Sequence, residues 1–200
     1  MYELTTIEAP VQAILLKEKG SKFIGYAFPV DDENSVRICL ETVKTEHPKA
    51  THHCYAFRIG LEGENYRAND DGEPSGSAGL PIYNQLLAHA VTNVLLIVVR
   101  YYGGTKLGVS GLVKAYKETA KQTLEASKII VRELETEVSA TFAFSQQHLM
   151  FTLLHKAEAK ILDFKSENNC HIRASVKLSQ KKSISEQLSE MPHVSFTFTT

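Results

Sequence analysis

The chain has 200 residues, of which 43% are hydrophobic and 22% charged, and its formal net charge is -1. This composition is typical of a globular protein and excludes a disordered or fibrous chain. The near-zero net charge also excludes nucleic-acid binding by bulk attraction, so any such binding depends on a local patch. The segment from Arg100 to Lys121 is the candidate, because it holds five basic residues and a single acid, Glu118.

The first residues lack the basic and apolar segments of a signal peptide, and no apolar run reaches the roughly 18 residues needed to cross a bilayer. We therefore expect a cytoplasmic protein. The three cysteines, Cys39, Cys54 and Cys170, are odd in number and widely spaced. That pattern favours free thiols over a disulfide framework.

Apolar and β-branched runs predict three strands in the first third of the chain, at residues 11–16, 22–30 and 52–60. Apolar residues at every third or fourth position predict a helix at 31–46, capped by Asn34 and stopped by Pro48. Residues 62–79 are polar and glycine-rich, which predicts an exposed loop.

Pro81 is expected in the first turn of a short helix that continues to residue 90. The strand predicted at 93–102 has a continuous apolar centre, which is typical of a strand buried on both faces. Ser110 is the predicted cap of the next helix. That helix has an apolar face and a separate lysine stripe, formed by Lys114, Lys117, Lys121 and Lys128.

After residue 130 the predicted elements follow the order βαββαβ, which is a ferredoxin-like split motif. The fold class is therefore α+β with two domains. The expected boundaries are residues 1–132 for an N-terminal α/β domain and residues 133–200 for a C-terminal ferredoxin-like domain.

Two glycine-rich loops each run into a predicted helix. Glycine lets backbone N–H groups approach a ligand closely, and the free N–H groups of a helix start favour an anion. Lys106 would add a point charge beside them. We therefore expect one binding site made of Asp70, Asp71, Gly72, Glu73, Ser75, Gly76, Arg100, Tyr101, Gly103, Gly104, Lys106, Gly108, Ser110, Gly111 and Lys114.

The acidic residues Asp70, Asp71 and Glu73 have two interpretations. Neighbouring carboxylates can share a cation or act as general acid and base. Asp-Gly and Glu-Pro are also ordinary turn dipeptides, and the spacing matches no calcium loop. Carboxylates at an anion site would repel the ligand unless a metal intervened.

Spacing argues against the common catalytic and metal motifs. His52, His53 and Cys54 are of metal-ligating types, but adjacent strand residues face opposite ways and the zinc-finger spacing is missing. No serine in the two loops lies in a Gly-x-Ser-x-Gly elbow, and Gly-Gly-Thr-Lys departs from the P-loop order. We therefore assign no catalytic residue, no metal and no cofactor.

Tyr101 and Tyr102 follow Arg100 directly. Aromatic and cationic side chains of this kind stack on bases in many RNA-binding modules. Because neighbouring strand residues face opposite sides, one tyrosine is expected in the core and the other is available for stacking.

The two loops, the His-His-Cys strand at 52–54, Val-Val-Arg-Tyr-Tyr-Gly-Gly at 98–104 and Gly-Leu-Val-Lys-Ala-Tyr at 111–116 together resemble the YigZ/IMPACT family, over about residues 18–127. The resemblance implies an N-terminal domain similar to the second domain of a small-subunit ribosomal protein. It also implies a C-terminal domain similar to a ferredoxin-like domain of elongation factor G. Eukaryotic members resemble regulators of translation under amino-acid stress and carry a further N-terminal partner-binding domain, which we do not expect here. No catalytic residue comes with the family.

We therefore expect a translation-linked regulatory protein that binds RNA, the ribosome or a translation-factor partner through the two loops, with no membrane partner. Two alternatives stay open. One is an enzyme acting on a small phosphorylated or anionic substrate, with Asp71 or Glu73 as base or metal ligand and Lys106 as anion clamp. The other is a protein-interaction module without nucleic-acid binding.

Overall fold

The computed structural model describes residues 2–199 and divides into two compact units. The N-terminal unit is Leu4–Arg132, and the C-terminal unit consists of the residues from Glu133 on together with Tyr2 and Glu3. The predicted two-domain α+β class is confirmed. Within the described residues, no helix is long and apolar enough to cross a membrane.

A five-stranded antiparallel sheet forms the centre of the N-terminal unit. Its strands, in spatial order, are β2 (Val11–Glu18), β3 (Ser21–Pro29), β6 (Val94–Tyr101), β4 (His52–Ile59) and β5 (Asn65–Asn69). Every residue of β6 except Tyr101 is buried. The prediction of a strand buried on both faces is therefore confirmed, because β6 is the middle strand of a sheet covered on both sides.

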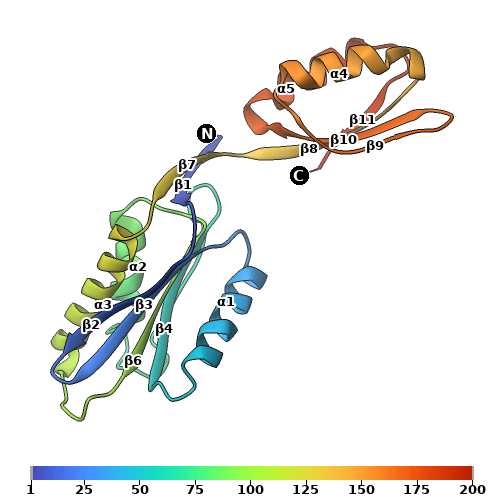
Figure 1. Cartoon of the computed structure of the whole chain (residues 1–200). Coiled ribbons are helices and arrows are strands. Elements are labelled where there is room, and N and C mark those ends of the chain that lie inside the picture. Colours follow the sequence, from blue (N-terminus) through green and yellow to red (C-terminus); the bar gives the residue numbers. More distant parts are fainter. Residues whose placement is uncertain (1, 200) are drawn as a thin grey trace. The chain divides into compact units, whose positions relative to one another are not determined.

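Helices cover both faces of this sheet, with α1 (Glu33–Glu46) on one side and α2 (Gly79–Ala88) and α3 (Gly108–Glu125) on the other (Figure 1). Successive strand residues point to opposite faces, so one strand supplies two cores. From β6, Leu95 and Ile97 pack with α1, whereas Leu96 and Val98 pack with α2 and α3.

The helix starts differ from the predicted ones. Asp32, not Asn34, caps α1: its carboxylate accepts from the Ser35 N–H at 2.7 Å, and its own N–H donates to the Ser35 hydroxyl at 3.2 Å. This reciprocal pair is a capping box, which satisfies two backbone donors at once. Ser110 lies inside the first turn of α3, whose N-cap residue Leu107 makes no side-chain capping bond. Both predicted caps are wrong.

Three short strands were not predicted. β1 (Glu3–Ile7) and β7 (Ile129–Glu133) pair as a two-stranded sheet, and β5 lies inside the predicted loop. All five residues of β5 are exposed, so its sequence carries no alternation of apolar and polar residues. This segment is a strand because its backbone pairs with β4, not because of its own residue pattern.

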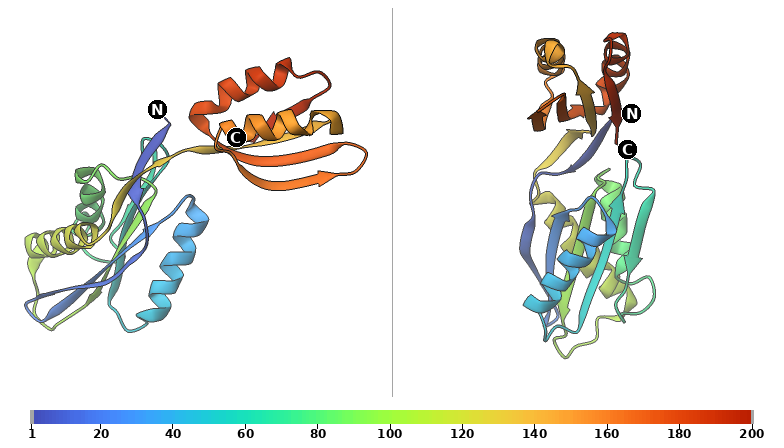
Figure 2. Two further views of the ribbon diagram at one scale, coloured as in Figure 1. Left: turned by 45° about the horizontal axis from the view of Figure 1, so that its top comes forward. Right: turned by 90° about the vertical axis from the view of Figure 1, so that its right-hand side faces the viewer.

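The C-terminal unit has the predicted ferredoxin-like order. Its elements are β8 (Glu135–Phe142), the short 3-10 turn η1 (Phe144–Gln146), α4 (Gln147–Lys156), β9 (Lys160–Ser166), β10 (Cys170–Lys177), the 3-10 turn η2 (Leu178–Gln180), α5 (Lys181–Glu190) and β11 (Ser195–Phe198). The strands form an antiparallel sheet of order β11-β8-β10-β9. Both helices cover one face of it (Figure 2), where Met150 and Leu188 pack on Val138 and Ile172.

Candidate functional site

Glu73 joins the two glycine-rich segments. Its Oε1 accepts a hydrogen bond from Arg100 Nη1 at 2.6 Å and another from the Tyr116 hydroxyl at 2.7 Å. The side chains of Glu73 and Arg100 are only 4% and 7% exposed. A buried ion pair with an added hydroxyl donor holds the first loop, the end of β6 and α3 in one fixed arrangement.

Two further side chains complete this cluster. His52 Nε2 lies 3.8 Å from Glu73 Oε1, and Cys54 Sγ lies 3.3 Å from the Tyr116 hydroxyl oxygen. Burial raises the pKa of the Tyr116 hydroxyl and of the Cys54 thiol, so both keep their protons. A protonated, fully buried thiol is a poor nucleophile. We call these five residues, His52, Cys54, Glu73, Arg100 and Tyr116, the Glu73 network.

Asp70 caps the start of α2. Its Oδ1 accepts from the N–H groups of Ala78 (3.0 Å) and Gly79 (2.8 Å), and its Oδ2 accepts from Gly76 N–H (2.8 Å). The N–H groups at this helix start, which were predicted to bind an anion, are therefore bound by a carboxylate of the same chain.

Asp71 ties the first loop to β4. Its Oδ2 accepts from the His53 N–H at 2.6 Å, and its carbonyl oxygen lies 2.7 Å from His52 Nδ1. With Asp70 and Glu73 also engaged, all three acidic residues make contacts within the protein. Among residues 2–199, no cluster of three His, Cys, Asp or Glu side chains has the arrangement of a metal site.

The second loop is open to solvent. Gly103, Gly104, Lys106 and Gly108 are exposed, and so are Ser110 and Lys114 in the first turns of α3. Within the described chain, Lys106 and Lys114 have no carboxylate within ion-pair distance, whereas the side chains of Lys121 and Lys128 pair with Glu125 (3.6 Å) and Glu8 (2.8 Å). Exposed Lys117 has no such partner there either, so the unpaired positive charge of the basic segment extends from the second loop into the third turn of α3.

The remaining predicted positions are spread over both loops. Gly72 and Ser75 are exposed in the first loop, and Gly111 is half-buried on α3. Gly103 lies against the β2–β3 turn, where an added Cβ would be 1.9 Å from the carbonyl carbon of Gly20. This glycine therefore permits a contact between two backbone segments, with no ligand involved.

The two tyrosines differ as the strand alternation predicts. The hydroxyl of half-buried Tyr101 is 2.9 Å from His47 Nδ1, whereas Tyr102 is 48% exposed. Arg100 lies over the Tyr102 ring, with its Cζ 5.6 Å from the ring centroid. The predicted site contained Tyr101 and omitted Tyr102. Tyr102 is two residues from Arg100, and this spacing indicates that the two side chains lie on the same side of the strand.

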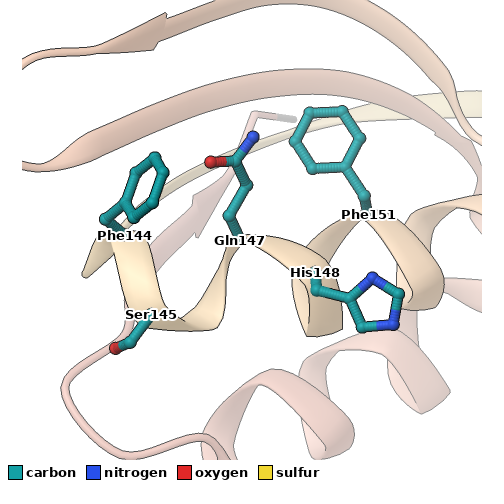
Figure 3. Close-up of a pocket in the computed structure, with 5 residues that line it drawn as sticks. All are labelled: Phe144, Ser145, Gln147, His148 and Phe151. Atoms are coloured by element: carbon teal, nitrogen blue, oxygen red, sulfur yellow. The ribbon is translucent and has the colours of Figure 1, made fainter.

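A separate hollow of about 490 Å³ lies on the C-terminal unit. Phe144, Gln147 and Phe151 project the same way from η1 and α4, and Ser145 and His148 complete its lining (Figure 3). Phe144 is 70% exposed, so this is helix surface rather than an enclosed cavity. None of the five lining residues carries a carboxylate to pair with His148.

Comparison with known proteins places the chain in a family. The family model of the Impact N-terminal domain matches residues 19–124 of this chain. The chain is 31% identical over 185 residues to the IMPACT family member of Haemophilus influenzae, covering 90% of each protein. It is 35% identical over 157 residues to IMPACT family member YigZ of Escherichia coli, covering 78% of this chain and 76% of that protein.

A solved structure extends the likeness to the whole fold. The crystal structure of a hypothetical protein aligns with a TM-score of 0.76 and 30% identity, covering 99% of this chain and 97% of that one. The Impact N-terminal match includes every residue of the Glu73 network and both glycine-rich loops. This chain therefore belongs to the IMPACT family.

Proposed function

We propose that this protein is a translation-linked regulator that binds RNA or a ribosome-associated partner through the second loop and the start of α3. The observation that carries the proposal is the difference between the two helix starts. Asp70 accepts from N–H groups at the start of α2, whereas the N-cap residue of α3, Leu107, makes no side-chain capping bond. The first residues of α3, Gly108, Val109 and Ser110, are exposed, and so are the unpaired Lys106 and Lys114, which suits a phosphate group.

The link to translation rests on the family. The resemblance described above implies that eukaryotic members regulate translation. Membership supports the same role for this chain, and the basic loop suits a partner made of RNA because phosphate contacts supply most of the affinity in such complexes.

The enzyme alternative has less support from the geometry. It requires Asp71 or Glu73 as a base or metal ligand. Glu73 is buried and already holds Arg100 and Tyr116, and the Asp71 carboxylate is bound to the backbone of β4. A base needs to reach its substrate's proton directly or through one water, and a carboxylate committed to the fold is poorly placed for that.

Fluorescence anisotropy with single-stranded and hairpin RNA between about 50 and 200 mM salt tests the proposal. Replacing Lys106 and Lys114 by alanine should weaken binding to all sequences and reduce the salt slope by about one for each phosphate that a lysine no longer neutralises. The matched control is Lys121→Ala with Lys128→Ala, which removes the same charge from two lysines already paired with carboxylates.

Binding that ignores salt, or an equal effect of the two double variants, would show that the basic loop is not the RNA site. A pull-down from cell extract with and without nuclease then distinguishes RNA from protein partners. Partners that survive nuclease treatment would favour the protein-interaction alternative.

A further inference from the structure

We propose that Tyr102 is a stacking platform for one unpaired base of single-stranded RNA. This inference rests on the proposed function and makes its ligand more specific. Phosphate contacts at Lys106 and α3 would position the strand, and Tyr102 would hold a base.

The Tyr102 ring is exposed, and the buried Arg100 side chain lies against one of its faces. Arg100 Cζ lies 5.6 Å from the Tyr102 ring centroid and 5.4 Å from that of Phe23. Arg100 is itself buried and neutralised by Glu73. One side of the Tyr102 ring therefore faces a buried guanidinium group that Glu73 holds, and 48% of the residue remains open to solvent.

The backbone under the ring is fixed at two successive residues. The N–H of Tyr102 donates to Thr51 Oγ1, and that of Gly103 donates to Ser21 Oγ, both at 3.2 Å. The close contact of Gly103 with Gly20 adds a steric limit. A ring held in place before binding loses little entropy when a base stacks on it.

The surroundings of Tyr102 suit a nucleotide. A hollow of about 440 Å³ is lined by Tyr102, Lys22, His47, Tyr101, Ile24 and Gly20, none of which is acidic. Such a volume is within the usual range for small-ligand sites, roughly 300–1,000 Å³. Lys22, which adds a positive charge to this lining, is exposed and stands directly across from Tyr101 in the sheet.

Tyr66 provides a contrast within the same unit. It is 59% exposed, but its ring stacks on Tyr83 with the centroids 5.1 Å apart. One face of the Tyr66 ring is therefore covered, as one face of the Tyr102 ring is by Arg100, but Tyr66 lies on β5 and not next to the second loop. Tyr66 is the natural control, because it has the same chemistry and similar exposure.

Fluorescence anisotropy of the full chain with a labelled mixed-sequence RNA oligonucleotide tests the platform. Tyr102→Leu should weaken binding about 5- to 150-fold, the range for losing one base stacked on an aromatic ring. Tyr102→Phe should bind like the wild type, and so should Tyr66→Leu. The salt slope should not change in Tyr102→Leu, because the variant keeps every lysine that meets a phosphate.

An abasic oligonucleotide of equal length isolates the contribution of the bases to binding, because it keeps the phosphates and lacks the bases. Wild type and Tyr102→Leu should bind it equally. If Tyr102→Leu binds RNA as tightly as the wild type, the platform is wrong while the proposed function stands. If the wild type does not bind RNA at all, the proposed function fails and the platform with it.

A base with its phosphate could come from an RNA strand or from a free nucleotide, and binding of adenosine monophosphate distinguishes the two. We expect RNA to bind far more tightly than the free nucleotide. If the nucleotide binds as tightly as RNA, and Tyr102→Leu abolishes this, the site is a free-nucleotide site and the assignment to RNA is overturned.

Discussion

Single buried side chains determine how the candidate site is held. Glu73 is the central example, because one carboxylate oxygen receives both a guanidinium and a phenol donor. A charged pair in a buried position stabilises the fold only while both partners are present, since the remaining charge would otherwise be unpaired and without solvent.

Glu73→Ala should therefore lower the free energy of unfolding of the N-terminal unit by about 3–5 kcal/mol. Urea unfolding followed by near-UV circular dichroism measures this, because seven of the eight tyrosines lie in Leu4–Arg132. The control is Glu41→Ala. Glu41 is 67% exposed and pairs with Lys44 at 3.5 Å, so its loss should cost less than about 1 kcal/mol. Similar changes in the two variants would contradict a structural role for Glu73.

His53 should make the stability of the same unit depend on pH. Burial lowers the pKa of His53 below its usual value, so the folded protein holds fewer protons there than the unfolded chain does. The free energy of unfolding should therefore decrease as pH falls from about 6.5 toward the lower, folded-state pKa.

Urea unfolding at a series of pH values between about 5 and 7.5 tests this expectation for wild type and His53→Gln. Glutamine keeps an N–H donor for the His47 carbonyl oxygen, which His53 Nε2 approaches at 3.2 Å. The variant should show a flatter pH dependence. Identical pH profiles would rule out His53 as the source.

At the scale of elements, the two helix starts differ although both follow glycine-rich loops. The start of α2 depends on Asp70, eight and nine residues before the N–H groups that it accepts from. Asp70→Ala should lower the free energy of unfolding by about 2–3 kcal/mol, because three donors lose a charged acceptor.

Asp70→Asn should lower the free energy of unfolding less than Asp70→Ala does, since the amide oxygen can still accept from the N–H groups of Ala78 and Gly79. Ser110→Ala in the first turn of α3 is the matched control and should change stability by no more than about 0.5 kcal/mol, because Ser110 is exposed and is not the N-cap residue of α3. Urea unfolding compares all three variants. A cost at Ser110 as large as that at Asp70 would show that Ser110 supports α3 in solution.

At the scale of the whole molecule, each compact unit has its own core and its own fully buried cysteine. Cys54 lies in a core of the N-terminal unit, and Cys170 lies in the core of the C-terminal unit. Both are 0% exposed, whereas Cys39 is half-buried on α1. Thiol protection therefore reports separately on each unit.

Pulsed thiol labelling across a urea gradient should give different midpoints for Cys54 and Cys170, with Cys39 labelled first. Glu73→Ala should move the Cys54 midpoint to lower urea and leave that of Cys170 unchanged. Mass spectrometry of the labelled peptides measures both at once. A joint shift would mean that the units unfold as one cooperative body.

Much of the fold followed from local patterns, and the exceptions have identifiable causes. The βαββαβ order and the doubly buried β6 were predictable because apolar spacing reflects burial. β5 was missed because it is exposed on every residue, and β1 and β7 pair across more than a hundred residues. The Asp32 cap had a usable signal, a serine three residues later that completes a reciprocal pair.

The candidate site was only partly predictable. The sequence by itself determined that two glycine-rich loops, a local basic segment and two adjacent tyrosines belong to one N-terminal domain. Only the tertiary structure decided that Asp70 closes the first helix start, that Glu73 holds Arg100, and that Tyr102 rather than Tyr101 is exposed. These outcomes depend on contacts between distant segments, such as Glu73 with Tyr116, which no local pattern of residues reveals.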